Sequence, residues 1–550
     1  MKRIAFIIEF VLTATIISSI LFIGNNFFFR IDITADKKYS LSEYTRKMLE
    51  ELDDYLTIRL YLGDKLPPEL KTLKDEIKYL LEEFKAYGGK YFNYEFIDPE
   101  AVATSREQLR VLFDNLTRKG LTINYFPYEE GGEKRQLLVV TGGFIEYGGN
   151  EVPVEFLKGA SATDPFEGLT RSISQIEYEL ISGFLKVKRG IRPVVALLRD
   201  KCALPQPRRL SFSKLISSIY GYQEVSLKEL NSLPNITVSE MCIRDRVFII
   251  DQFVMRGGNL VLCINGVSAS MDSLAHNNTM VVFPFSHGLE SFLMNAGIVV
   301  SPRIVMDLNC SPVPIISGMV AGAPVYDYVP WVFFPICLPQ ENEPVVKNID
   351  PVLLRFPSRL EITRVKDLNY RILLTTGRNS RTVQTPYVVN LNILRKKPDF
   401  SLFNEKTIPV AILVEGNFQS SFAQYRNFYS FAANMKEKTV KPVKIAVVSD
   451  AEVFSNQTRG NPPQPLPVGY DKYTGKLWGN GQFLMSLLHY MCGDTALLIL
   501  KNKEIRVKPL NTQIVRQHRT IIQAIAMSSP LLFAILLYVV FYLLRKKYNS

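Results

Sequence analysis

Two carboxylates, Asp450 and Glu452, directly follow the apolar stretch Ile445 to Val448, which has the composition of a buried strand. Open α/β sheets bind their ligands where the parallel strands end, so this pair stands at a favourable position. Carboxylate oxygens placed there could coordinate a cation. A solvated turn is the more common explanation for two acidic residues after a strand. The sequence leaves both interpretations open.

A second set of polar residues has the same ambiguity. Its members could line a ligand crevice, or they could cap helices. Together with Asp450 and Glu452, four of them make up the candidate interaction crevice, and Met271 adjoins them. The four are Asp251, Gln252, Asp272 and Ser273.

The spacings that mark catalytic and cofactor sites are missing. Between Gly469 and Gly475 there are five residues where a Walker loop has four, and Leu477 stands where that loop needs Ser or Thr. Cys263 falls inside a predicted strand, which favours buried core over a nucleophile. No zinc or hydrolase motif includes any of the four histidines. They are His276, His287, His489 and His518. We therefore expect no catalytic residue, no cofactor and no metal site, and expect any ATP hydrolysis to belong to a partner.

Composition describes a largely globular chain. It has 550 residues, of which 47% are hydrophobic and 21% charged, and length alone suggests about three to four domains. The net charge of +12 is not gathered into one basic stripe or a recognition helix, which argues against nucleic acid. Anionic lipid headgroups, or simple solvation, account better for the basic excess. The six cysteines form no C-x-x-C pair.

Both ends of the chain have the pattern of membrane spans. Residues 4–24 are almost wholly apolar after Lys2 and Arg3, and residues 521–544 contain no charge and precede a basic stop sequence. A basic juxtamembrane segment, residues 501–520, precedes the second span. The positive-inside rule, with the first helix dominant, places both termini in the cytoplasm. The expected location is the inner (cytoplasmic) membrane, with the large body periplasmic.

Between the spans, residues 30–190 alternate as β-α-β-α-β-β-α, the order of a thioredoxin-like domain. Ser40 to Glu43 predicts a capping box at the first helix, and Pro67 to Gly89 predicts a long helix. The two late strands are expected at Leu121 to Phe126 and Gln136 to Val140. Because the first cysteine is Cys202, this domain lacks the C-x-x-C of a redox enzyme.

Residues 191–500 predict a second α/β domain with an open, mostly parallel sheet. Buried strands are expected at Val194 to Leu198, Asn259 to Ile264, Val410 to Val414 and Ile445 to Val448. Helices are expected at Leu210 to Tyr220, Phe248 to Met255 and Phe483 to Met491. The whole chain is thus expected to be α/β, with two transmembrane helices flanking two domains.

Several stretches together resemble the GldG family of gliding-motility-associated ABC transporter subunits, nearly from end to end. They are Arg30 to Thr34, Lys38 to Ser42, Glu83 to Tyr87, Tyr94 to Pro99, Ile176 to Glu179, Ile250 to Gly258, Met271 to Leu274, Asn348 to Pro351, Val414 to Ser420 and Leu466 to Asp471. The chain departs from the family between Asn235 and Val247. There the charged run Val238 to Arg246 predicts that a central strand is interrupted.

The resemblance implies an auxiliary, substrate-binding-type subunit that works beside a multi-span permease and a separate ATPase. It also implies that the second domain is similar to class I glutamine amidotransferase-like folds, without an evident catalytic set. Two other functions remain open on the residues alone. One is an extracytoplasmic amidotransferase- or hydrolase-like enzyme on the same fold, and the other is a pure membrane scaffold.

Overall fold

The computed structural model describes most of the chain from residue 40 to residue 501, together with a few isolated positions nearer the two ends. The gaps are residues 65, 104, 131–132, 158–168, 189–192, 199–204, 227–235, 240–243, 272, 275–277, 321–322, 396–397 and 424–434. Both predicted membrane spans fall almost entirely outside the described residues. Within those residues, no helix combines the length and the apolar character that crossing a bilayer requires.

The first helices begin and end at the signals that the sequence carries. In α2 (Glu43–Glu50), Ser42 is the N-cap and its hydroxyl accepts the Thr45 N–H. The cap is therefore Ser42, and not Ser40 as the capping-box pattern predicted. The long helix α3 (Pro68–Gly88) is confirmed, with proline at its first turn and Gly89 at a φ of +53° after its end.

A four-stranded N-terminal sheet has the order β2-β1-β5-β6, with β1 and β2 parallel and the other pairs antiparallel. Its outer helix α7 packs on β5 and β6. The Glu177 carboxylate, at the start of α7, accepts the Ser42 N–H at 2.8 Å and the Thr45 hydroxyl at 2.7 Å. The elements are β1 (Leu56–Leu60), β2 (Phe92–Phe96), α4 (Pro99–Val102), α5 (Arg106–Arg118), β5 (Gly142–Tyr147), β6 (Asn150–Glu155), α6 (Leu169–Ser174) and α7 (Ile176–Lys188).

The two late strands of this sheet are not the ones predicted. The predicted segments form β3 (Ile123–Glu130) and β4 (Glu133–Val140), which pair only with each other in a separate hairpin. The sheet is completed instead by β5 and β6, joined by a two-residue turn of Gly148 and Gly149, both at positive φ. Both pairs alternate in the same way, so the local pattern does not distinguish them.

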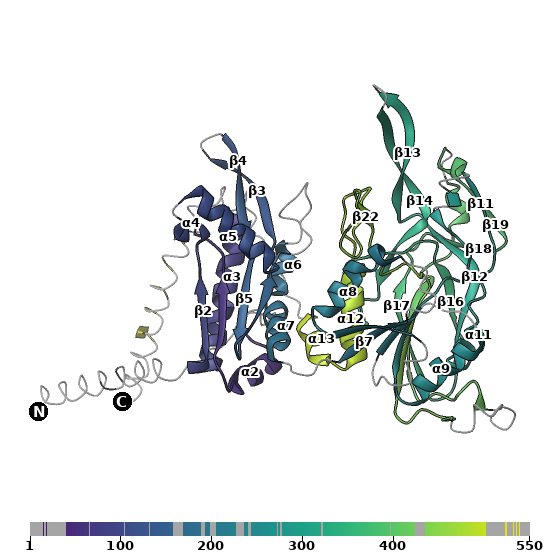
Figure 1. The fold of residues 1–550 in the computed structure, drawn as a ribbon, viewed down its shortest axis with the longest axis horizontal. Coiled ribbons are helices and arrows are strands. Elements are labelled where there is room, and N and C mark those ends of the chain that lie inside the picture. Colours follow the sequence, from purple (N-terminus) through teal and green to yellow (C-terminus); the bar gives the residue numbers. More distant parts are fainter. Residues whose placement is uncertain are drawn as a thin grey trace, which may run out of the picture. The chain divides into compact units, whose positions relative to one another are not determined.

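A large mixed sheet, the central sheet, lies in the second part of the chain (Figure 1). Its order is β13-β14-β17-β20-β21-β10-β9-β7-β8, and β21, β10, β9, β7 and β8 are mutually parallel. The remaining neighbours are antiparallel. The parallel strands are β7 (Val194–Leu198), β8 (Gly221–Val225), β9 (Ile236–Ser239), β10 (Asn259–Cys263) and β21 (Val443–Val448), and β20 (Pro409–Gly416) and β17 (Leu368–Thr375) continue the sheet.

Helices cover both faces of the central sheet because its inner strands are apolar on both sides. Val261 and Cys263 of β10 pack toward Phe483 and Leu487 on one face. Leu260 and Leu262 pack toward the opposite face. The first face is covered by α8 (Leu210–Ser217) and α12 (Asn480–Cys492), followed by α13 (Thr495–Lys501), and the second by α9 (Arg244–Met255) and α11 (Glu290–Asn295).

A central strand does form between Asn235 and Val247, but residues 240–243 of the charged run lie outside the described residues, so the predicted interruption beyond Ser239 stays a prediction. Ile236–Ser239 forms β9, which pairs in parallel with both β7 and β10. This strand begins before the charged run and ends at Ser239. Arg244, inside that run, is already the first residue of α9.

A β-rich region between α9 and β20 was not anticipated from the sequence. It builds a third core around Trp331 and Phe333. From it the hairpin of β13 and β14 extends well beyond the neighbouring strands (Figure 1). The strands are β11 (Thr279–Val282), β12 (Ile298–Asp307), β13 (Cys310–Val320), β14 (Ala323–Pro339), β15 (Val352–Leu353), β16 (Ser358–Ile362), β18 (Ser380–Gln384) and β19 (Tyr387–Asn390), with β22 (Thr458–Arg459) and β23 (Gln464–Pro465) later in the chain.

One glycine controls whether β5 can join the N-terminal sheet. A Cβ at Gly143 would collide with the Arg59 carbonyl oxygen and lie 2.8 Å from the Leu60 Cα. We expect Gly143→Ala to lower the free energy of unfolding by about 3 kcal/mol, since backbone atoms cannot yield as side chains do. Urea unfolding of the detergent-solubilised chain measures this. Gly318→Ala, where no atom lies within 4 Å of the new Cβ, is the matched control and should change stability by less than about 0.5 kcal/mol. Equal stability of the two variants would contradict the packing described here.

Candidate functional site

The carboxyl ends of β10 and β21 lie side by side and border a cavity. The register pairs Cys263 with Val448, so Asn265 and Ala451 follow their strands at the same edge of the sheet. The cavity has a volume of about 320 Å³. Its walls include Ile264, Asn265, Ser268, Phe285, His287 and Ala451. This is the edge at which open α/β sheets bind ligands.

Backbone hydrogen bonds fix the walls of the cavity. The Asn265 side-chain oxygen accepts the Ala451 N–H at 2.8 Å and so joins the two strand ends. Ser268 N–H donates to the Phe283 carbonyl at 2.9 Å, and Phe285 N–H donates to the Gly266 carbonyl at 3.0 Å. These bonds hold the segment after β10 against the segment after β11.

His287 supplies the most polar side chain of the wall. It is 4% exposed, and its Nδ1 accepts the Leu289 N–H at 3.1 Å. Burial lowers the His287 pKa, although the Glu290 carboxylate 3.7 Å away partly offsets this. A neutral ring that accepts at Nδ1 carries its proton on Nε2 and offers a donor there. The described residues that line the cavity are therefore uncharged at neutral pH.

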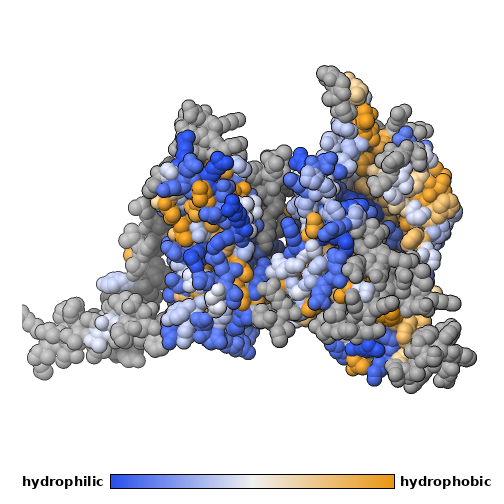
Figure 2. Space-filling model, in the orientation of Figure 1, coloured by the Kyte–Doolittle hydropathy of each residue, from blue (hydrophilic) through white to orange (hydrophobic). Residues whose placement is uncertain are grey.

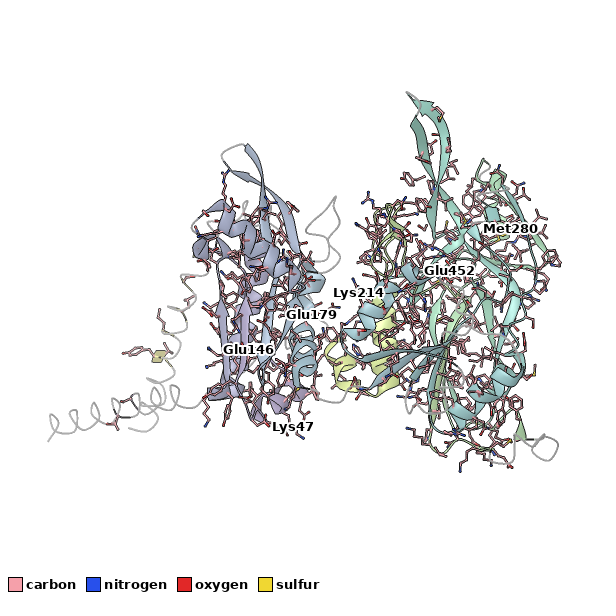
Figure 3. All side chains as sticks on the ribbon, viewed as in Figure 1. Lys47, Glu146, Glu179, Lys214, Met280 and Glu452 are labelled. Carbon is pink, nitrogen blue, oxygen red and sulfur yellow. The ribbon has the colours of Figure 1, made fainter. Side chains whose placement is uncertain are left out.

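Asp450 and Glu452 lie beside the cavity, and each has protein partners. Asp450 is buried and accepts the Arg355 and Glu452 N–H groups, both at 2.8 Å. Burial raises the pKa of Asp450 to about 7. Glu452, labelled in Figure 3, forms an ion pair with Arg208 at 2.6 Å. The two carboxylates thus hold the turn that presents Ala451 to the cavity.

Asp251 and Gln252 belong to the opposite edge of the sheet. The Asp251 carboxylate is fully buried and accepts the Ser420 hydroxyl at 2.6 Å and the Ser421 N–H at 2.8 Å. Gln252 accepts the Lys436 N–H at 2.7 Å and donates to its carbonyl at 3.0 Å. These contacts reach the segment after Gly416, which pairs with Val443 at the amino end of β21. The structure therefore does not bring this pair together with Asp450 and Glu452.

Two of the remaining residues lie next to the cavity wall in the chain. Met271 and Ser273 follow Ser270, which is part of the wall, and Ser273 is exposed. Asp272 lies outside the described residues. Asn265, Phe285 and His287 were not predicted. Asn265 could have been found, because it follows the correctly predicted strand β10 at the favoured edge.

The described thiols and metal-ligating side chains add no reactive site to this edge. In the part of the chain that the structure describes, no three His, Cys, Asp or Glu side chains are placed to hold a metal ion. Burial raises the pKa of Cys310 to about 12 and holds the pKa of Cys337 well above its usual range, so both thiols stay protonated. Cys263 is buried within β10.

Comparison with known proteins finds a family model that matches the region containing the cavity. A family model described as an ABC-type uncharacterized transport system matches residues 192–486, which include every cavity residue. A domain of unknown function (DUF7088) matches residues 35–145. An uncharacterized protein of Borreliella burgdorferi is 20% identical over 496 residues, covering 87% of this chain and 86% of that protein. No solved structure matches the chain.

The raised pKa of Asp450 predicts how stability depends on pH. Between about pH 4 and pH 7 the unfolded chain releases this proton while the folded chain keeps it, so the free energy of unfolding falls as pH rises through that window. We expect Asp450→Asn to remove this fall, which amounts to a few kcal/mol. Urea unfolding at pH 4.5, 5.5, 6.5 and 7.5 measures it. The backbone hydrogen bond that asparagine loses is independent of pH, so the slope reports ionisation alone. Identical slopes for wild type and variant would refute the assignment.

Proposed function

The chain belongs to the family of ABC-type uncharacterized transport systems, and we propose that it is a non-catalytic, substrate-binding-type auxiliary subunit of a transporter linked to gliding motility. Family membership makes it an auxiliary component of ABC transport, for which a permease and an ATPase are the general partners. The single observation that carries the substrate-binding role is the uncharged cavity at the carboxyl ends of β10 and β21, inside the family segment. The resemblance to GldG supports the link to gliding.

The chemistry of the cavity favours binding over catalysis. A hydrolase needs a nucleophile within hydrogen-bond reach of a base. The Ser268 hydroxyl bonds the Phe283 backbone, accepting its N–H at 3.0 Å and donating to its carbonyl at 3.3 Å. His287 Nδ1 is engaged by Leu289. Serine and histidine in this wall are thus held by backbone groups and not by each other.

Strand order supports the fold kinships that belong to this proposal. When the four strands of the N-terminal sheet are numbered by their order in the chain, they lie side by side in the order 2-1-3-4. The first two are parallel, as expected of a thioredoxin-like domain. The parallel part of the central sheet runs β8-β7-β9-β10-β21, the 2-1-3-4-5 order of doubly wound folds. That order is the expected basis of an amidotransferase-like second domain.

The proposed setting is the inner membrane, with spans at residues 4–24 and 521–544, both termini in the cytoplasm and the body periplasmic. In this setting the ATPase lies across the membrane, so the body can reach only the permease. The hairpin of β13 and β14, here called the arm, supplies a surface for that contact. Its 30 residues from Cys310 to Pro339 include one charge, Asp327. Its described exposed apolar residues are Ile316, Met319, Val325, Tyr326, Tyr328 and Leu338.

Co-purification from native membranes tests the proposal. We expect the wild-type chain, extracted in mild detergent, to carry a multi-span permease and an ATPase identified by mass spectrometry. Replacing two cross-strand neighbours on the arm, Ile316→Ser with Tyr326→Ser, should reduce recovery of the permease at least tenfold, because both side chains are exposed and form one apolar face.

Val440→Ser is the matched control, since Val440 is equally exposed but lies on the segment before β21. It should leave recovery unchanged. A chain that purifies alone, without permease or ATPase, would defeat the proposed function. Full recovery with the arm variant would remove the arm from it.

A further inference from the structure

The cavity opens onto a row of exposed apolar side chains. Val281, Phe283 and Phe285 alternate along one extended segment and are 46%, 53% and 45% exposed, and Phe285 is also part of the cavity wall. Val388 of β19 stands opposite Val281. Hydrophobic surface is visible over β11 and β19 in Figure 2. Met280 and Val282, which flank Val281 in β11, are buried, so the row rests on a packed core.

We propose that the cavity and this row bind a single-chain amphiphile, whose uncharged polar head enters the cavity while its apolar chain lies along Phe285, Phe283 and Val281. This inference rests on the proposed function and names the substrate class of the substrate-binding role. A monoacylglycerol, with a hydroxyl-bearing neutral head and one acyl chain, represents the class.

The groups in the wall select an uncharged head. His287 offers its Nε2 donor, and Asn265 offers the NH₂ of its side-chain amide. The bond described for this amide is the one in which its oxygen accepts the Ala451 N–H. Two neutral donors suit hydroxyl and ester oxygens. Among the residues that the structure describes, the lining contains no lysine or arginine, and burying a carboxylate or phosphate without a cation is costly. An anionic amphiphile should therefore bind more weakly than its neutral analogue.

The dimensions separate the head from the chain. A cavity of about 320 Å³ accepts a small polar head and not a long acyl chain as well. The row continues outward from the cavity over four residue steps, which is about 13 Å at the rise of a strand. Two phenyl rings along this path provide apolar contact area for a chain.

The backbone beside the cavity disfavours an extended peptide. A peptide that adds to a strand needs free N–H and C=O groups on the strand edge. The polar groups of Phe283 and Phe285 that face Ser268 and Gly266 are already bonded. The opposite edge is occupied by Pro284, which has no N–H to donate. The site therefore offers side chains and not a backbone edge.

Photo-crosslinking tests the proposal on the full chain in phosphatidylcholine nanodiscs. The probe is a monoacylglycerol with a diazirine in its acyl chain, and labelled peptides are located by mass spectrometry. We expect labelling within residues 279–288, competed by unlabelled monoacylglycerol. Affinity of the competitor should rise about fourfold per methylene until the chain covers the row. The matching fatty acid and an extended apolar peptide should each compete at least tenfold less well.

Three variants separate the parts of the site. Phe283→Ser with Phe285→Ser should lower labelling at least tenfold, whereas Phe400→Ser, which is more exposed but outside the row, should not change it. Asn265→Asp keeps the bond to the Ala451 N–H and loses the NH₂ donor, so it should also weaken labelling.

Wild-type labelling in the double variant, or equal competition by fatty acid or peptide, would overturn the proposal. Permease recovery is measured on the same preparations. Recovery without labelling would refute the amphiphile alone, and labelling without recovery would refute the transporter complex alone.

Discussion

The parallel pairing of β10 with β21 is the constraint on which the second part of the molecule depends. It joins residues almost two hundred positions apart, from Leu260 with Ile445 to Cys263 with Val448. Successive residues of both strands enter opposite hydrophobic cores, so a shift of one residue would exchange the faces of the sheet. The same register brings Asn265 within hydrogen-bonding distance of the Ala451 N–H. The core and the cavity are therefore set by one pairing.

A buried chain of polar groups then ties the N-terminal part to the helices on the central sheet. Tyr220 donates to the Asp494 carboxylate at 2.8 Å and so accepts from His489 Nδ1, while Tyr178 of α7 lies 2.8 Å from His489 Nε2. Burial raises the pKa of both tyrosines, which keeps them as donors. Because each ring nitrogen and hydroxyl has a partner, removing one member leaves the others unsatisfied in a medium of low dielectric. These bonds join α7 of the N-terminal part to α12 on the central sheet.

Local signals predicted the elements whose determinants are local, and missed those decided by contact with distant segments. The proline and glycine limits of α3 and the apolar run of β7 are read directly from the chain. Membership of β5 in the N-terminal sheet depends on Gly143 meeting the Arg59 backbone, which no window of sequence around Gly143 contains. For the site, strand-end reasoning through Asp450 led to the edge of the sheet that borders the cavity. Strand-end reasoning did not place Asp251. This residue lies in α9, which precedes β10, and the segment that it contacts lies at the amino end of β21. His287 joins Asn265 only because residues 283–285 pair with 266–268.

The two exposed apolar surfaces differ in what lies beneath them, and this difference suits different tasks. The row Val281, Phe283 and Phe285 is backed by the buried Met280 and Val282, and its segment is bonded to the cavity wall. Side chains held in this way lose little freedom when a small ligand binds, which favours affinity from few contacts. In the outer part of the arm, between Pro314 and Tyr328, the described residues of the two strands pair with each other. A two-stranded ribbon without a covering layer gains stability from a partner that covers it. A rigid small-molecule site and a ribbon that is completed by association are the two elements that a binding subunit of a larger membrane complex needs.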